Sequence, residues 1–144
     1  MSEYTMRRSL RNWGLLLALT AATFAGCRVA QAPPLKELQR ARSGALNIVL
    51  LSENPTLRRG KDAFVLEFRG ADRQLVDVGI VSITATMTMP GMSPMFGDTA
   101  VKATATKGRY DVTSDLSMAG TWRVNVEWNG PAGRGAASLP GSVF

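Results

Sequence analysis

The sequence predicts an all-β domain, an immunoglobulin-like antiparallel β-sandwich of about seven strands. Three observations lead to this prediction. Apolar and polar residues alternate with a period of two over most of the chain after Ala45. Turn residues separate these segments at intervals of roughly ten residues. No segment after Ala45 shows the period of an amphipathic helix, and a chain of 144 residues suits one domain of this kind.

The clearest strand signal spans residues 121–128, where Trp122, Val124, Val126 and Trp128 share one face and polar side chains share the other. We therefore expect Trp122 in the core, with Met118 packed beneath it. The longest signal spans residues 76–89. The predicted strands, of which the last is an edge strand, are 46–51, 63–68, 76–89, 101–106, 109–118, 121–128 and 136–139.

Residues 1–26 have the pattern of a secretory signal peptide. Arginines 7, 8 and 11 precede an uncharged apolar run at residues 14–26. This run is shorter than the roughly 20 residues that span a bilayer, so a membrane anchor is the weaker alternative. Met6, which directly precedes the arginines, is an alternative start to Met1.

Cys27 is the only cysteine, and it follows Thr23-Phe24-Ala25-Gly26. Small residues before a cysteine resemble a bacterial lipobox, whose cysteine carries the lipid and becomes the first residue. Phe24 departs from that pattern, which usually has an aliphatic residue there. A buried or reactive thiol is the alternative, but a free thiol is a liability in an oxidising compartment, and Cys27 has no disulfide partner in the chain.

The predicted organisation is a signal peptide with lipobox (1–26), a lipidated cysteine with a flexible tether (27–44) and a β-sandwich domain (45–144). Pro33-Pro34 favours an extended tether. We expect an extracytoplasmic protein of the cell envelope, held to a membrane by the lipid on Cys27.

Charge and composition argue against two classes of function. The net charge is +6, of which residues 1–26 hold +2, and the rest forms no basic helix interleaved with aromatic side chains. This pattern does not favour nucleic acid as a partner. The chain has no histidine, its acidic residues are scattered, and it offers no Ser-His-Asp or Cys-His arrangement. We therefore expect a protein that is not an enzyme.

Four of the seven methionines lie close together, at positions 87, 89, 92 and 95. A thioether is a soft, neutral ligand that suits Cu(I). Met87 and Met89 share a strand face, and the Pro90-Gly91 pair can turn the chain so that Met92 or Met95 returns toward that face.

The methionine segment therefore predicts a Cu(I) site made by Met89 and Met92, with Met87 or Met95 as a third sulfur. Phe96 is a candidate aromatic cap, because its ring face would attract the cation. Zinc is not expected, since the mature chain offers it neither imidazole nor free thiolate. The alternative is packing: methionine fills cores well, and Met87 continues the apolar face of its strand.

Several segments resemble the YtkA-like/FixH-like group of bacterial envelope domains, which are β-sandwiches similar to the CopC-type copper-binding fold. The segments that carry the resemblance are 60–64 (GKDAF), 71–76 (ADRQLV), 87–92 (MTMPGM), 108–110 (GRY) and 118–124 (MAGTWRV). The resemblance covers roughly residues 44–130 and implies the same fold. Family members often have a histidine in or after the methionine segment, where this chain has Ser93 and Pro94.

The resemblance therefore implies metal binding only for Met89 and Met92, with Met87 and Met95 as further candidates. It links such domains to metal handling, oxidase assembly and efflux. One predicted function is a Cu(I)-binding lipoprotein for copper delivery or tolerance, with a copper transporter or an oxidase-assembly protein as partner. The other is a metal-free interaction or assembly domain that contacts a membrane protein through its sheet edges or its methionines.

The signal pattern makes a direct prediction about the mature protein. Protein purified from its native membrane should begin at a lipid-modified Cys27, because residues 1–26 are removed during export. Intact-mass spectrometry measures this. A membrane fraction in which the chain still begins at Met1 or Met6 contradicts the lipoprotein assignment.

Overall fold

The alternating pattern corresponds to eight strands in the computed structural model, which describes residues 33–144. The strands are β1 (Lys36–Ser43), β2 (Leu46–Ser52), β3 (Gly60–Arg69), β4 (Ile80–Met87), β5 (Met95–Ala103), β6 (Arg109–Leu116), β7 (Gly120–Gly130) and β8 (Gly133–Val143). All neighbouring strands pair antiparallel, so the predicted all-β sandwich is confirmed, with eight strands in place of about seven. Cys27 and the predicted signal peptide lie outside the described residues, within which no helix is long and apolar enough to cross a membrane.

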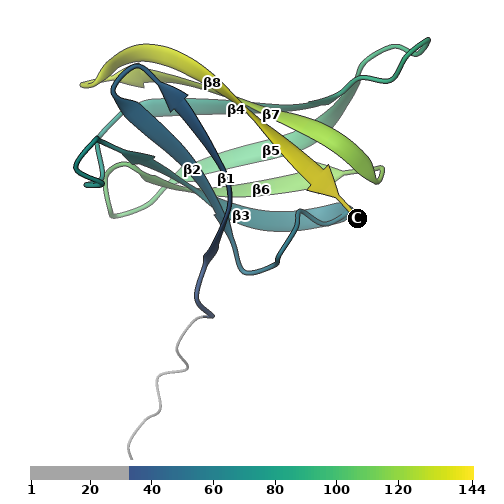
Figure 1. Ribbon diagram of the computed structural model, residues 1–144, viewed down its shortest axis with the longest axis horizontal. Coiled ribbons are helices and arrows are strands. Elements are labelled where there is room, and N and C mark those ends of the chain that lie inside the picture. Colours follow the sequence, from purple (N-terminus) through teal and green to yellow (C-terminus); the bar gives the residue numbers. More distant parts are fainter. Residues whose placement is uncertain (1–32) are drawn as a thin grey trace, which may run out of the picture. The chain divides into compact units, whose positions relative to one another are not determined.

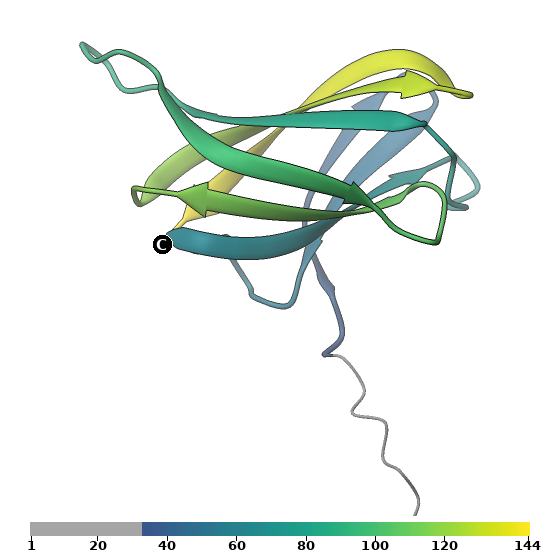
Figure 2. The ribbon, with the colours of Figure 1, turned by 180° about the vertical axis from the view of Figure 1, so that it is seen from behind.

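The strand order is β1-β2-β3-β6-β5-β4-β7-β8, and β5 joins the two layers of the sandwich (Figures 1 and 2). The first part of β5, residues 95–97, pairs with β4, whereas residues 98–103 pair with β6. Gly97 lies where β5 changes partner. A side chain there would collide with Leu116 and would lie 3.3 Å from Cζ3 of Trp122. The core therefore comes directly against the backbone at the crossing, and glycine there leaves the Leu116 side chain its place.

The core lies between the two layers and consists of inward-facing apolar side chains. The four residues that the alternation places on the inner face of β7 are all at most 4% exposed, and Trp122 is completely buried. Its indole Nε1–H donates a hydrogen bond to the Met118 carbonyl oxygen at 2.9 Å. The predicted inner face of β7 is thus confirmed, and the one polar atom of Trp122 has a partner.

An aromatic cluster fixes the connection between β3 and β4. Phe68 makes edge-to-face contacts with Tyr110 and Trp128, at centroid distances of 5.6 and 5.3 Å. The Tyr110 hydroxyl donates a hydrogen bond to the Gly79 carbonyl oxygen at 2.7 Å. Burial, aided by the negative charge of Asp77, raises the pKa of Tyr110, so this hydroxyl remains a donor at neutral pH.

Several predicted boundaries are wrong. The strand predicted at 76–89 begins only at Ile80 and ends at Met87. The Gly79 backbone N–H donates to the Asp77 carboxylate at 3.0 Å, and Gly79 has a φ of 76°, so a turn precedes β4. The predicted strands 101–106 and 109–118 are displaced at their ends, and the predicted edge strand 136–139 is longer.

The predicted tether is also too long. Residues 36–43 form β1, which pairs antiparallel with β2, so the folded domain begins well before residue 45. The alternation does not reveal this strand, because β1 turns only a few apolar side chains toward the core. As an edge strand, it is held largely by backbone hydrogen bonds. Gly44, with a φ of 58°, makes the turn into β2.

Replacement of Trp122 by alanine should destabilise the domain severely. Loss of a fully buried large aromatic side chain costs about 3–5 kcal/mol, a large part of the stability of a small domain. The matched control is Phe144→Ala, because Phe144 is 76% exposed and its loss should change the free energy of unfolding by no more than about 0.5 kcal/mol. Denaturant unfolding measures both, and similar losses for the two variants would contradict the assignment of Trp122 to the core.

Tyr110→Phe should lower the free energy of unfolding by about 1 kcal/mol, because it removes the hydrogen bond to Gly79 and keeps the ring. The midpoint of urea unfolding should fall while its slope stays unchanged. An unchanged midpoint would show that this hydrogen bond does not stabilise the β3–β4 connection.

Candidate metal site at the methionine end

Residues 88–94, here called the methionine loop, connect β4 to β5 and project from one end of the sandwich (Figures 1 and 2). The Met92 backbone N–H donates a hydrogen bond to the Met89 carbonyl oxygen at 3.2 Å. Gly91 has a φ of 76°, a conformation that glycine adopts without strain. Residues 89–92 therefore form a β-turn with Pro90 and Gly91 at its centre. The turn expected from Pro90-Gly91 is present.

The strand ends bring two further methionines together. Met87 and Met95 are directly opposite each other in the β4–β5 pairing, so their side chains share one face. Met87 is 8% exposed and belongs to the core, and Met95 is half-buried against it. The Met87 methyl group lies against Gly120, where an added Cβ would be only 2.5 Å away from it.

Burial decreases along the methionine loop. Met89 is half-buried and packs against the core, whereas Met92 is 60% exposed. The structure thus gathers all four predicted thioethers at one end of the sandwich, here called the methionine end. Met87 is placed for packing, and Met92 is open to solvent. This donor set fits a soft monovalent ion, because thioethers are soft and uncharged.

Phe96 lies on the other face of β5. It is 69% exposed and pairs with Thr86, whereas Met95 beside it pairs with Met87 on the inner face. Because neighbouring residues of a strand point to opposite faces, the structure does not bring the Phe96 ring over Met87 or Met95.

Met118 is placed differently from the prediction. It lies in the short connection between β6 and β7 and is 40% exposed, so it is not a core residue. Its backbone carbonyl oxygen accepts the hydrogen bond from the Trp122 indole at 2.9 Å. The segment Gly120-Thr121-Trp122 indicates a strand entry at this point, but the alternation alone does not show where the preceding side chain goes.

A family model described as YtkA-like matches residues 40–127, which include the methionine loop and the connection that carries Met118. The chain belongs to the YtkA-like family. This membership confirms the resemblance seen in the sequence and is consistent with an extracytoplasmic protein of the cell envelope. No curated protein and no solved structure matches the chain.

Several ionisable groups of the YtkA-like domain form ion pairs away from the methionine end. Glu67 is 5% exposed and forms ion pairs with Arg69 and with Arg109, the latter at 3.3 Å. Lys107 pairs with Asp77 at 2.9 Å, and this contact lowers the pKa of Asp77. Over residues 33–144, no three histidine, cysteine or acidic residues gather as metal ligands would.

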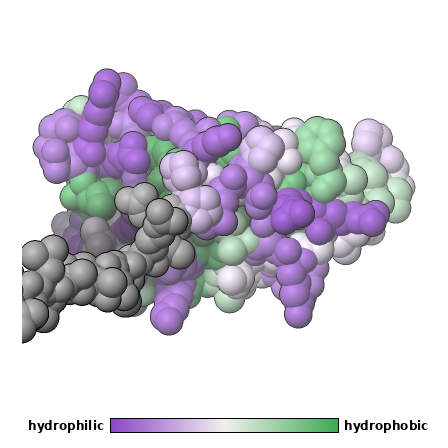
Figure 3. All heavy atoms as spheres, turned by 90° about the horizontal axis from the view of Figure 1, so that it is seen from below, coloured by the Kyte–Doolittle hydropathy of each residue, from purple (hydrophilic) through white to green (hydrophobic). Residues whose placement is uncertain are grey.

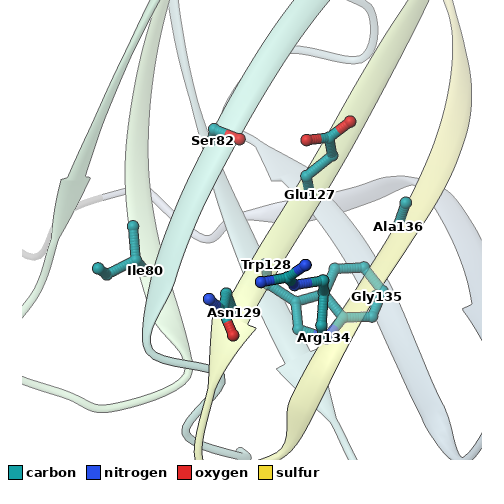
Figure 4. A pocket seen from close by; sticks show the side chains of 8 residues that line it. All are labelled: Ile80, Ser82, Glu127, Trp128, Asn129, Arg134, Gly135 and Ala136. Atoms are coloured by element: carbon teal, nitrogen blue, oxygen red, sulfur yellow. The ribbon is translucent and has the colours of Figure 1, made fainter.

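A shallow depression lies on the outer face of β4, β7 and β8 (Figure 4). Arg134 and Asn129 lie near each other there, and Glu127 points away from them. The depression measures about 530 Å³ and includes Ile80, at the start of β4. Ile80 and Met87 are at opposite ends of that strand, about 23 Å apart at about 3.3 Å per residue. No methionine lines this depression, so it is separate from the methionine end.

Proposed function

We propose that this YtkA-like domain binds one Cu(I) ion at the methionine end and serves copper delivery or tolerance at the cell envelope. Met89 and Met92 would bind the ion, with Met95 or Met87 as a third sulfur. One observation carries the proposal. The β-turn at 89–92 and the pairing of Met87 with Met95 bring four thioethers to one end of the domain.

The local structure reduces the cost of ordering such a site. The φ of Pro90 is fixed by its ring, and Gly91 already has the positive φ that the turn requires. Met95 is held by the strand pairing, so few backbone angles remain to be fixed when an ion binds. Neutral thioethers hold Cu(I) less tightly than thiolates would. Such a site therefore suits transfer to a membrane partner, such as a copper transporter or an oxidase-assembly protein.

Exposed apolar side chains at the same end favour a second candidate function, contact with a membrane protein without metal. Met92, Phe96 and Met118 are 60, 69 and 40% exposed. In Figure 3 pale green and pale purple residues lie at the end from which the methionine loop projects in Figure 1, beside strongly hydrophilic ones. Flexible methionines on a protein surface adapt to the shape of a partner.

Cu(I) titration separates these candidates. The full chain with Cys27→Ser, which removes the only thiol, is titrated anaerobically in detergent against a coloured Cu(I) chelator. It should take up one Cu(I) per chain and no zinc. Met89→Leu/Met92→Leu should compete at least about tenfold less well, because leucine keeps the volume and removes two sulfurs.

Ile80→Leu is the matched control, since it changes an exposed apolar side chain at the opposite end of β4 from Met87 and should leave the affinity unchanged. Thermal melts of all variants should agree, which shows that the fold is preserved. If the chain and the double variant compete equally poorly, the methionines are packing or partner contacts, and the second candidate function takes the place of the first.

A further inference from the structure

The connection between β6 and β7 lies beside the methionine loop although the two are far apart in sequence. Gly120, at one end of the connection, packs against the methyl group of Met87. Leu116, at the other end, packs against Gly97, two residues beyond Met95. Residues 117–119 are therefore held next to the ends of β4 and β5 from which the methionine loop projects.

Met118 sits in the middle of this connection, with its backbone fixed and its side chain free. Trp122 is completely buried, and its indole N–H holds the Met118 carbonyl oxygen at 2.9 Å. Met118 is 40% exposed, whereas Met89 and Met95 are half-buried and pack against the core. Among the methionines within residues 33–144, Met92 and Met118 are the two most exposed, so these two residues are the most open to an ion from solution.

We infer that Met118 is a further Cu(I) ligand, which completes the site from a second connection. This inference rests on the proposed function. The methionine loop itself holds only Met89 and Met92, so a third sulfur from the adjoining strand ends would have to come from buried Met87 or half-buried Met95. Met118 supplies a third sulfur without removing a side chain from the core. The ion would then bridge the methionine loop and the β6–β7 connection, and Trp122 would act as a positioning residue by fixing the backbone of Met118.

NMR of methyl-labelled methionines tests this directly. The full chain with Cys27→Ser, labelled with ¹³C at the methionine ε-methyl groups, is titrated with Cu(I) alone under anaerobic conditions. Met118→Leu, Met92→Leu, Met89→Leu and Met87→Leu each remove one resonance and so assign it. The resonances of Met89, Met92 and Met118 should shift together and saturate at one equivalent of Cu(I), whereas the buried Met87 resonance should shift least.

Competition against a chelator measures the Cu(I) affinity of the same variants. Met118→Leu should weaken Cu(I) binding at least about tenfold, with an unchanged thermal melt because the side chain is exposed. If the Met89 and Met92 resonances shift while Met118 stays in place and Met118→Leu binds normally, the inference is overturned and the proposed function stands. If no methionine resonance shifts, both are overturned.

Discussion

The position of Trp122 is the constraint on which the rest of the methionine end depends. Its ring fills the space between the layers where β5 crosses from one to the other, and a side chain at Gly97 would collide with Leu116 and come within 3.3 Å of this ring. Its one polar atom is satisfied by the Met118 carbonyl oxygen, since an unpaired indole N–H would be costly at this depth. The same side chain therefore stabilises the core, sets the path of β5 and fixes the β6–β7 connection beside the methionine loop.

The alternation of apolar and polar side chains predicted the strands that have one buried face. In β7 large apolar residues alternate with polar ones, and the buried face follows from that period. Two strands depend on pairing or on close packing instead. β1 lies at an edge with most of its residues partly or fully exposed. In β8 the predicted strand was too short because glycine and alanine look like a loop, yet Gly135 is small because the Trp128 ring lies against its backbone.

Some features of the candidate site likewise follow from the local sequence, whereas others depend on packing between distant segments. The shared face of Met87 and Met95 and the turn at Pro90-Gly91 follow from local rules, which are the period of a strand and the conformations open to proline and glycine. The alternation also places Phe96 and Met95 on opposite faces of β5. The predicted aromatic cap did not take this into account. The place of Met118 depends on contacts between segments distant in sequence, which neither periodicity nor composition reports.

We propose that the methionine end forms a site for a soft ion built from thioethers alone. X-ray absorption at the copper edge, on the full chain with Cys27→Ser loaded with one equivalent of Cu(I), tests this most directly. It identifies the atoms bound to the metal without assuming which residues supply them. We expect the atoms bound to copper to be sulfur alone. A shell made of oxygen or nitrogen would contradict it, because the copper would then be held by carboxylate, carbonyl or water ligands elsewhere on the chain.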